Sequence, residues 1–380
     1  MPDAGIVVVG AGPVGATFAL LAAARGLSVA LIDAREGAST ETRSLALSHG
    51  SRIVLARAGA WDGLVSPAEI HTIHTSQQGG FGRVKLSRED AQVPALGYVV
   101  GYAALQAALD AALATAGVRV TFGARVSTIR MDGVEYNVGT AGGATQFAGA
   151  EAVVLADGGA NLDKLADVKV DEKDYGQSAM LATLSTDRAH RHTAYERFTP
   201  EGPLALLPDH NESTYSMVWV ASHTRIQTLM AQGEDDVRQQ FQTHFGTRAG
   251  RFVSLAHRRA YPLRLRQTNT RVSGSTVIVG NAAQAMHPVA GQGFNLGLRD
   301  AETLAGLLSQ QPVDDALRAY SQMRAPDVMR GVGFTDLLAS VFLPDVATLR
   351  VPRGLALCLV DMLPFARRML AQRMLYGARG

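Results

Sequence analysis

The sequence predicts an α/β protein, with a parallel sheet wound from separate stretches of the chain, a second sheet layered over it and a helical C-terminal tail. Three observations predict this fold. Apolar runs end in glycine at Gly10, at Asp157–Gly158 and at Gly280, as buried parallel strands do. The segments TYSMVWVAS and RRAYPLRL read as strands of another layer. Beyond about residue 332, apolar residues recur at helical spacing.

Composition limits the possible functions. The chain has 380 residues, 47% of them hydrophobic, so it can form two domains with a sizeable core. A net charge of +2 without a long Lys/Arg block argues against nucleic-acid binding. Cys358 is the sole cysteine, which excludes an intramolecular disulfide, a CxxC zinc site and a redox pair, and fits a reducing, cytoplasmic compartment. We expect no signal peptide and no membrane-spanning segment.

The N-terminal stretch IVVVGAGPVGATFALLAAARGLSVALIDA predicts a strand, a glycine-rich turn, a helix and a second strand. The strands cover 6–9 and 29–32, and the turn carries GxGxxG at Gly10, Gly12 and Gly15. Gly10 makes the tight turn, Gly12 lets the backbone approach a pyrophosphate, and Gly15 lets helix and strand pack closely. The helix N-terminus offers N–H groups and a positive dipole to the phosphate.

Asp33 ends the second strand about 20 residues beyond the motif, where an acid can accept ribose hydroxyls. A GxGxxG that lies between strand and helix, with an acid at this distance, indicates a site for an adenine dinucleotide. The alternative is a glycine-rich turn without a ligand.

The three glycine-rich strand ends indicate one extended cofactor rather than three sites, because ligands of an open parallel sheet lie beyond the carboxyl ends of its strands. Arg43, in the loop STETRSLALSHGS, should face the same phosphates. The sequence has no second GxGxxG, which a separate nicotinamide-binding domain would usually bring.

In these motifs and in two further segments, the chain resembles the group A flavoprotein aromatic hydroxylases, and within them the ubiquinone-biosynthesis hydroxylases that act on polyprenylated phenols. The most specific segments are YERFTPEGPLALLP (195–208) and GNAAQAMHPVAGQGFNLGLRD (280–300). The Asn-Ala-Ala-Gln form of the second segment is most similar to the 2-polyprenyl-6-methoxyphenol hydroxylase branch, whereas close relatives more often have Gly-Asp there. The resemblance covers essentially the whole chain.

The resemblance implies a para-hydroxybenzoate hydroxylase-like architecture: a Rossmann-like FAD-binding domain, a mixed or antiparallel sheet substrate domain and a helical C-terminal tail. The expected boundaries are 1–71, 97–170 and 262–331 for the discontinuous FAD-binding domain, 72–96 and 171–261 for the substrate domain, and 332–380 for the helical C-terminal region. Leu206, Trp219 and Tyr261 are candidate walls of the substrate pocket, with packing in the core as the open alternative.

The resemblance also implies FAD as bound cofactor and NAD(P)H as co-substrate. Asn281 would contact the ribityl and phosphate region, Pro288 would lie against the flavin face, and the Gly291–Gly293 loop would offer N–H groups to the pyrimidine. Asn295 would open the following helix as an N-cap and face the ring with another donor. His287 would lie near the flavin in a structural or a catalytic role, so no catalytic residue is assigned. The expected cofactor-binding residues are Gly10, Ala11, Gly12, Pro13, Gly15, Asp33, Ala34, Arg43, Gln106, Val126, Asp157, Gly158, Asn281, Pro288, Gly291, Gly293, Phe294 and Asn295.

Two positions bear on how closely the chain follows the family pattern. Gln106, in GYAALQAAL, matches a family helix residue near the flavin phosphates, with an exposed helix glutamine as the alternative. After Asp157–Gly158 the family pattern continues with Ser and Arg, but this chain has Asn161 and Lys164. That departure bears on the phosphate region and on the approach of the nicotinamide.

The resemblance therefore implies an FAD-dependent, NAD(P)H-consuming monooxygenase that uses molecular oxygen to hydroxylate a polyprenylated phenol in ubiquinone biosynthesis. The protein would orient the ring and exclude water, while the cofactor carries the chemistry. No metal and no nucleic acid are expected. The alternatives are another FAD monooxygenase or prenyl reductase of the superfamily, and a weakly active structural flavoprotein of a ubiquinone-biosynthesis assembly. Ring position, prenyl length, NADH against NADPH and homo-oligomer formation stay open.

The C-terminal segment 345–380 mixes apolar residues at helical spacing with arginines and few acids. Such a helix can lie in a membrane interface, with arginines at anionic headgroups. A helix packed on the catalytic domains or on another subunit is the equal alternative. The first possibility would place the protein on the inner face of the cytoplasmic membrane.

Overall fold

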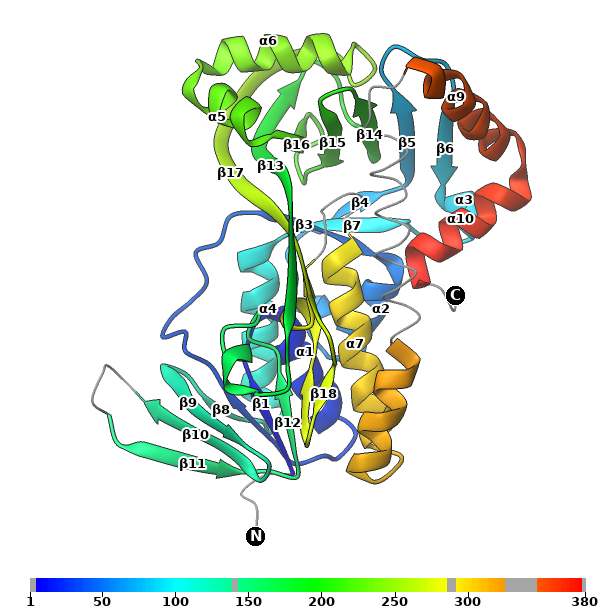
Figure 1. The fold of residues 1–380 in the computed structure, drawn as a ribbon. Coiled ribbons are helices and arrows are strands. Elements are labelled where there is room, and N and C mark those ends of the chain that lie inside the picture. Colours follow the sequence, from blue (N-terminus) through cyan, green and yellow to red (C-terminus); the bar gives the residue numbers. More distant parts are fainter. Residues whose placement is uncertain (1–4, 139–142, 286–291, 325–346, 378–380) are drawn as a thin grey trace.

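The computed structural model describes residues 5–138, 143–285, 292–324 and 347–377. Two sheets form its main layers, and Figure 1 shows the parallel sheet with its helices in the lower half and an eight-stranded sheet in the upper half. The predicted α/β fold with a second sheet and a C-terminal helical region is confirmed.

The lower sheet has the strand order β18-β19-β12-β1-β2-β8. Its strands are β1 (Ile6–Val9), β2 (Val29–Ile32), β8 (Arg119–Thr121), β12 (Ala152–Leu155), β18 (Val272–Ser273) and β19 (Thr276–Ile278). All pairings are parallel except β18 with β19. The predicted strands 6–9 and 29–32 are β1 and β2.

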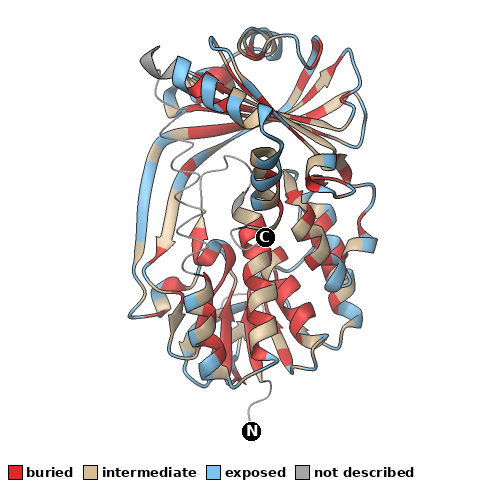
Figure 2. Ribbon diagram, turned by 90° about the vertical axis from the view of Figure 1, so that its right-hand side faces the viewer, coloured by how far each residue is buried: buried red, intermediate tan, exposed pale blue. Residues whose placement is uncertain are grey.

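Both faces of this sheet are covered, which explains why its strands are apolar throughout. Val8 packs in the cluster that includes α1 (Pro13–Ala23), α4 (Tyr102–Thr115) and α7 (Gln292–Leu308). Val7 packs on the other side, against a small sheet of β9 (Ala124–Arg130), β10 (Gly133–Val138) and β11 (Thr145–Gly149). Figure 2 shows the buried residues that line this lower half.

The upper sheet has the order β20-β17-β13-β16-β15-β14-β5-β6. Its strands are β5 (Thr72–Gln77), β6 (Arg83–Ser87), β13 (Val170–Thr186), β14 (Thr193–Thr199), β15 (Gly202–Pro208), β16 (Thr214–Ser222), β17 (Phe252–Thr268) and β20 (Gln284–Ala285). The predicted strand TYSMVWVAS is β16, and RRAYPLRL lies within β17. Helices α5 (His223–Ala231) and α6 (Glu234–Phe245) cover one face, whereas the other turns toward the lower layer (Figure 1).

Smaller elements join the two layers and cover one end. A three-stranded sheet consists of β3 (Ser44–Ser48), β7 (Gly97–Gly101) and β4 (Ala68–Ile70), and α2 (His49–Arg57) and α3 (Arg88–Ala91) follow β3 and β6. The tail forms α9 (Ala347–Met362) and α10 (Pro364–Tyr376), which pack on β6 and α3. Of the helices in the described ranges, none has the length and apolarity needed to cross a bilayer.

We propose the expected domain boundaries as the division of the chain, since residues 72–87 and 170–268 supply seven of the eight upper strands. The division is not a clean cut. β13 and β17 each have 17 residues and run continuously from one layer into the other (Figure 1). The proposed boundary after residue 261 therefore falls inside β17.

Candidate functional site

The turn after β1 requires glycine at two of its three motif positions. Gly10 has a φ of +102°, and a Cβ there would lie 2.7 Å from the backbone of Ala156 and Asp157. A Cβ on Gly15 would lie 2.0 Å from the carbonyl oxygen of Gly10. Both glycines are thus fixed by packing between β1, α1 and β12.

Gly12 differs from the other two because the protein itself does not require glycine there. Its φ of −61° and ψ of 170° suit any L-residue. The nearest heavy atom to an added Cβ is the Tyr102 hydroxyl oxygen, 4.0 Å away. The open space lies against the N-terminus of α1, where backbone N–H groups favour an anion. This cradle fits the pyrophosphate of a dinucleotide.

A closed hydrogen-bond network holds the same loop. Asp33 accepts the N–H of Ala11 with one carboxylate oxygen and that of Arg35, at 2.7 Å, with the other. The buried Gln106 donates to the Ala11 carbonyl oxygen at 2.8 Å and to Asp110 at 2.9 Å. Arg35 closes the ring with two bonds to Asp110, at 2.8 and 2.9 Å, and this hydrogen bonding raises the pKa of Arg35. Both polar groups of the Ala11 backbone are therefore fixed.

This network gives the predicted residues specific positions. Gln106 is buried and bonds to the loop at Ala11, so the alternative of an exposed helix glutamine is wrong. Arg35 and Asp110 were not predicted. The available signal was spacing, since Asp110 lies one helical turn after Gln106 and faces the same side. Pro13 is the first residue of α1, Ala34 is exposed beside Asp33, and Val126 lies half-buried in β9.

Arg43 lies beside the open space, together with a tyrosine that the sequence analysis did not identify. Its guanidinium is 4.9 Å from the centre of the Tyr102 ring, and the Tyr102 N–H donates to the Arg43 carbonyl oxygen at 2.9 Å. Burial raises the pKa of Tyr102, so its hydroxyl stays protonated near neutral pH and can donate to an anion. Its position as first residue of α4 was the signal for it.

The three glycine-rich strand ends meet, as predicted. Gly10 lies against Asp157 at the end of β12. A Cβ on Gly280, after β19, would lie 3.1 Å from Val14 of α1, and one on Gly297 would lie 2.7 Å from the same side chain. The segment 280–300 and the GxGxxG turn are therefore packed against each other, although they lie far apart in the sequence.

Asn161 has a clear place in this edge. Asp157 accepts the N–H of Gly159 at 2.8 Å and the side-chain amide of Asn161 at 2.6 Å. Asn161 thus fixes the carboxylate in the turn at Gly158, whose φ is +72°. Lys164 lies one turn further on, 4.0 Å from Asp163.

Asn295 is placed differently from the prediction. Helix α7 begins at Gln292, so Asn295 lies in its first turn and is not the N-cap. The side chain is buried, accepts from the Ser48 N–H at 2.8 Å and the Ser51 hydroxyl at 2.7 Å, and donates to the Ala46 carbonyl oxygen at 3.0 Å. These bonds tie α7 to β3 and α2, because all three partners belong to that strand and helix.

The remaining residues of the C-terminal motif are placed as follows. Asn281 is exposed just after β19, Gly293 has open space beside its Cα, and Phe294 is half-buried. The predicted positions His287, Pro288 and Gly291 lie outside the described residues.

Asp300, also missed from sequence, anchors the loop after β19. It is fully buried, accepts the Gly280 N–H at 3.1 Å and pairs with Arg324 at 2.7 Å. Arg271 approaches its other oxygen at 3.9 Å. These donors satisfy a buried carboxylate that would be costly to leave without partners.

The upper sheet has two different faces, and Leu206 and Trp219 lie on the one away from the lower layer. Both side chains are fully buried, and the Trp219 ring lies 5.6 Å from that of Phe241 in α6. They form the core beneath α5 and α6. We therefore do not carry them into the substrate pocket, and the core-packing alternative describes their placement.

The opposite face is turned toward the lower layer (Figure 1). The hydroxyl of Ser216 in β16 lies 2.8 Å from that of Ser44 in β3, a strand of the small sheet that joins the two layers. Strand alternation and pairing put Leu181 and Val218 on the same face, next to Ser216. Both are half-buried, whereas Met180 and Trp219 on the helix-covered face are fully buried. Tyr261 pairs with Ala179 on this incompletely covered face and is half-buried.

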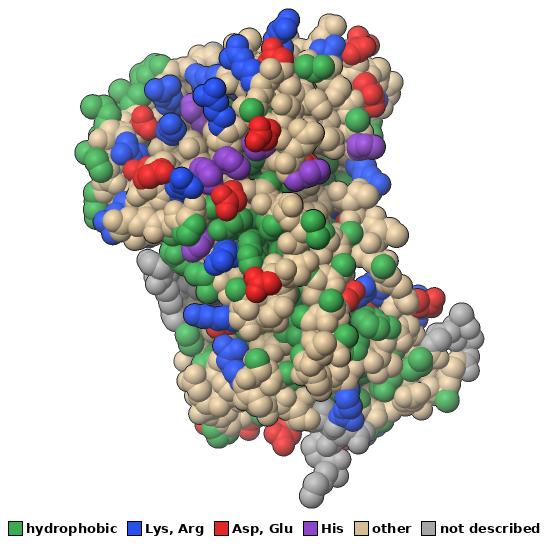
Figure 3. All heavy atoms as spheres, turned by 180° about the vertical axis from the view of Figure 1, so that it is seen from behind, with side chains coloured by type: hydrophobic (Ala, Val, Ile, Leu, Met, Phe, Trp, Pro, Cys, Tyr) green, Lys and Arg blue, Asp and Glu red, His purple; other side chains and the backbone are tan. Residues whose placement is uncertain are grey.

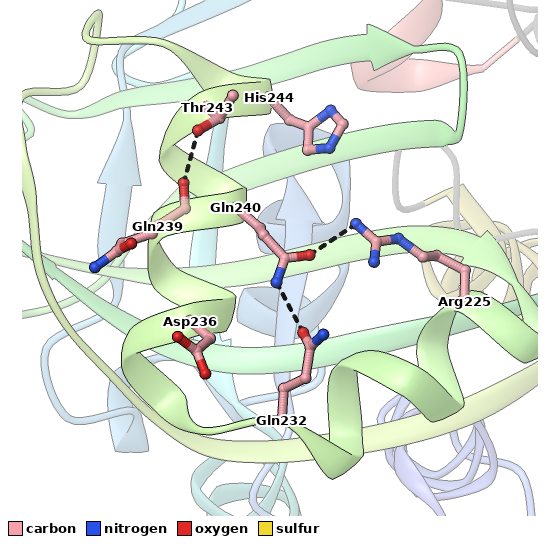
Figure 4. A pocket seen from close by; sticks show the side chains of 7 residues that line it. All are labelled: Arg225, Gln232, Asp236, Gln239, Gln240, Thr243 and His244. Atoms are coloured by element: carbon pink, nitrogen blue, oxygen red, sulfur yellow. Dashed lines mark hydrogen bonds between the residues drawn. The ribbon is translucent and has the colours of Figure 1, made fainter.

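A polar depression of about 410 Å³ between α5 and α6 lies on the other side of the sheet (Figure 4). Arg225, Gln240 and Gln232 are linked in it by bonds of 3.0 and 2.8 Å. Because α5 and α6 cover the face that is turned from the glycine motifs, this depression is separate from the dinucleotide site.

Comparison with known proteins agrees with these features. The family model described as FAD binding domain matches residues 3–335. Ubiquinone hydroxylase UbiL of Rhodospirillum rubrum is 30% identical over 383 residues, which cover 96% of this chain and 88% of that protein. The 3-demethoxyubiquinol 3-hydroxylase of Escherichia coli is 30% identical over 374 residues, 93% of each chain.

Solved structures share the fold. The p-nitrophenol 4-monooxygenase PnpA from Pseudomonas putida DLL-E4 aligns with a TM-score of 0.80 at 18% identity, over 99% of each chain. PqsL of Pseudomonas aeruginosa, a probable FAD-dependent monooxygenase, aligns with a TM-score of 0.76 at 20% identity, over 93% of this chain and 99% of that one.

Proposed function

This chain belongs to the FAD-binding domain family, and we propose that it is an FAD-dependent, NAD(P)H-consuming monooxygenase that hydroxylates a polyprenylated phenol in ubiquinone biosynthesis. The relatives named ubiquinone hydroxylase UbiL and 3-demethoxyubiquinol 3-hydroxylase support this substrate class. In the reaction, a ring C–H, O₂, NAD(P)H and a proton give the ring C–OH, water and NAD(P)⁺.

The observation that carries the cofactor assignment is the open space beside Gly12. Neither the backbone conformation of Gly12 nor the packing around it requires a glycine, so the space is explained by a bound group. FAD, when bound, supplies the redox chemistry with NAD(P)H and oxygen. The pyrophosphate would lie against Gly12, with Arg43 and the Tyr102 hydroxyl beside it. Asp33 and Gln106 keep the loop in shape, while Asp157 and Asn281 lie at the neighbouring strand ends. These residues fit the cofactor because N–H groups, a guanidinium and a hydroxyl lie beside the open space at Gly12.

We place the phenol ring between the glycine-rich edge and the half-buried face of the upper sheet. Leu181, Val218 and Tyr261 offer apolar and aromatic surface to a ring there. The chain's contribution is orientation of the ring and exclusion of solvent.

A weakly active structural flavoprotein is the second candidate, because this chain lacks the Ser and Arg that usually follow Asp-Gly. The hydrogen bond from Asn161 to Asp157 favours the active monooxygenase over the structural flavoprotein, because it keeps the carboxylate at that turn fixed. Reduction of the bound flavin by NAD(P)H at a useful rate, with a phenol present, would exclude the structural candidate.

Two experiments test the proposal. Cells that lack the protein should accumulate one polyprenylated phenol, identified by mass spectrometry of quinone intermediates, and the wild-type gene should remove it. The purified protein should form hydroxylated product in step with NAD(P)H oxidation. An unchanged quinone profile, or oxidation that only water-soluble phenols stimulate, would contradict the proposed substrate.

We also propose that the protein works in the cytoplasm at the inner face of the membrane, where such a substrate resides.

A further inference from the structure

The two tail helices expose an apolar surface that their packing does not explain. The inner side of α9 and α10 is used, because Leu357, Ala371 and Leu375 are buried in a core with Val84 and Leu86 of β6. The outer side nevertheless carries large apolar side chains. We call them the tail patch: Val351, Leu355, Leu359, Met362, Leu363, Phe365 and Met369. The helices are therefore both packed and amphipathic, which combines the two alternatives of the sequence analysis.

The tail patch protrudes at its centre. Met362 ends α9 and Pro364 begins α10, so the chain bends between them. At this bend Met362 and Phe365 are each 78% exposed. Scattered exposed apolar residues are ordinary, but bulky ones gathered on one convex corner mark an interaction surface. A projecting corner of this kind suits a soft, deformable layer better than a rigid concave partner.

Charge is distributed to match an anionic surface. Within α9 and α10 the sequence has five arginines and one acid, Asp361. That acid is turned to the body of the protein, where it accepts the Lys85 N–H at 2.8 Å. Arg368 and Arg373 are exposed, as are the Arg83 and Lys85 side chains of β6 beneath the helices. Figure 3 shows Lys and Arg side chains, together with a few Asp and Glu, among hydrophobic ones at the upper left of that view, where α9 lies.

We propose that the tail patch is the surface by which the protein docks on an anionic lipid bilayer, with Met362 and Phe365 inserted among the acyl chains and Arg373 at the headgroups. This proposal rests on the proposed function, because a polyprenylated substrate resides in the bilayer. Such a helix pair lies in the interface without crossing it. It sits on β6, at the edge of the sheet whose other strands form the proposed substrate wall, so docking brings that wall to the membrane.

The test is co-sedimentation of the full FAD-loaded protein with phosphatidylcholine vesicles, with and without phosphatidylglycerol. We expect binding to the anionic vesicles that weakens with salt, because exposed charge attraction is screened. The affinity of M362E/F365E for these vesicles should be lower by roughly tenfold or more, since two inserted apolar side chains become charged. M131E is the matched control, because Met131 is also 78% exposed but lies in the turn between β9 and β10. It should bind as the wild type does.

A second pair of variants tests the charge. Arg373→Gln should lose part of the preference for anionic vesicles, whereas Arg119→Gln, at an exposed arginine of β8, should keep it.

Several results would overturn the proposal. Wild-type protein that ignores vesicles, or equal losses in M362E/F365E and M131E, would show that the tail patch does not bind lipid. Concentration-dependent dimers in ultracentrifugation that M362E/F365E abolishes, without vesicle binding, would assign the patch to a second copy of the chain. Leu355→Gln/Leu359→Gln gives an independent variant on α9 should the first fold poorly. Bound FAD and NAD(P)H oxidation with a short-chain phenol are measured in each case, so that loss of the proposed enzyme activity is distinguished from loss of docking.

Discussion

Gly12 gives the sharpest test of the cofactor site. Its backbone conformation is open to any L-residue, and an added Cβ would meet only the Tyr102 hydroxyl, 4.0 Å away. Gly12→Val should therefore leave the apoprotein folded, at a cost of about 1 kcal/mol for a branched residue at a helix N-cap. The same side chain fills the space where a pyrophosphate would lie.

The expected loss of affinity follows from the contacts that would be displaced. Pushing the pyrophosphate away from the helix N-terminus removes about two charge-assisted hydrogen bonds, each worth about 1.5–3 kcal/mol. The total of about 3–6 kcal/mol raises the Kd for FAD by roughly 10²- to 10⁴-fold. After dialysis the variant should be colourless, and flavin fluorescence titration should measure the weaker Kd.

Two glycine variants serve as controls. Gly306→Val adds the same side chain in open space on α7, away from the motif, and should keep full FAD occupancy. Gly15→Ala should unfold the protein or lower its Tm strongly, since its Cβ would lie 2.0 Å from a backbone oxygen. A folded Gly12→Val protein that purifies yellow with full occupancy would refute the assignment of this space to the pyrophosphate.

Three further predictions concern other parts of the molecule. Leu181→Ala should raise the KM for the phenol with little change in Tm, whereas Leu184→Ala, on the helix-covered face, should cost about 2–5 kcal/mol of stability and leave KM unchanged; the opposite pattern in kinetics and thermal melts would reverse our assignment of the two faces. Asn281→Asp should change the Kd for FAD by no more than about tenfold, or roughly 1.4 kcal/mol, because the exposed residue gains a charge near the phosphates but takes the commoner family form; complete loss of FAD in a titration would show that it is misplaced. Burial lowers the pKa of His190 below its ordinary 6.5, so on acidification the unfolded chain takes up a proton before the native chain does. The free energy of unfolding should therefore fall as the pH drops below 6.5. In urea melts at several pH values His190→Gln should flatten this fall, and an unchanged pH dependence would exclude His190 as its cause.

The elements that form the proposed nucleotide site could be predicted because their signals are local. The strand at 6–9, the GxGxxG turn and the strand ending at Asp33 lie within one continuous stretch, and each depends on residues next to it in the chain. The meeting of Gly10, Asp157 and Gly280 followed from one general rule, that parallel strands end at the same edge of a sheet.

The roles of single side chains were harder to predict. Asn295 was expected at a helix start facing the cofactor, but the helix begins earlier and the side chain bonds to Ser48 and Ser51, which lie far away in sequence. The Arg35–Asp110 pair and the buried Asp300 also depend on partners from distant segments. A charged residue in a single sequence does not reveal whether such a partner exists.

From the sequence we could predict the first two strands, the dinucleotide motif and the two-sided character of the tail helices, since these depend on neighbouring residues and on a fixed period. Which neighbour each side of a strand or helix faces depends on the tertiary structure. Alternation along 214–222 separates Val218 from Trp219, but packing of Phe241 on Trp219 selects the helix-covered face and leaves Val218 toward the FAD-binding domain. In the same way β6 covers one side of α9 and α3 covers one side of α10, which leaves Met362 and Phe365 exposed. The physical reason is that a period specifies two faces equally well, and the choice between them is made by surfaces that come from elsewhere in the chain.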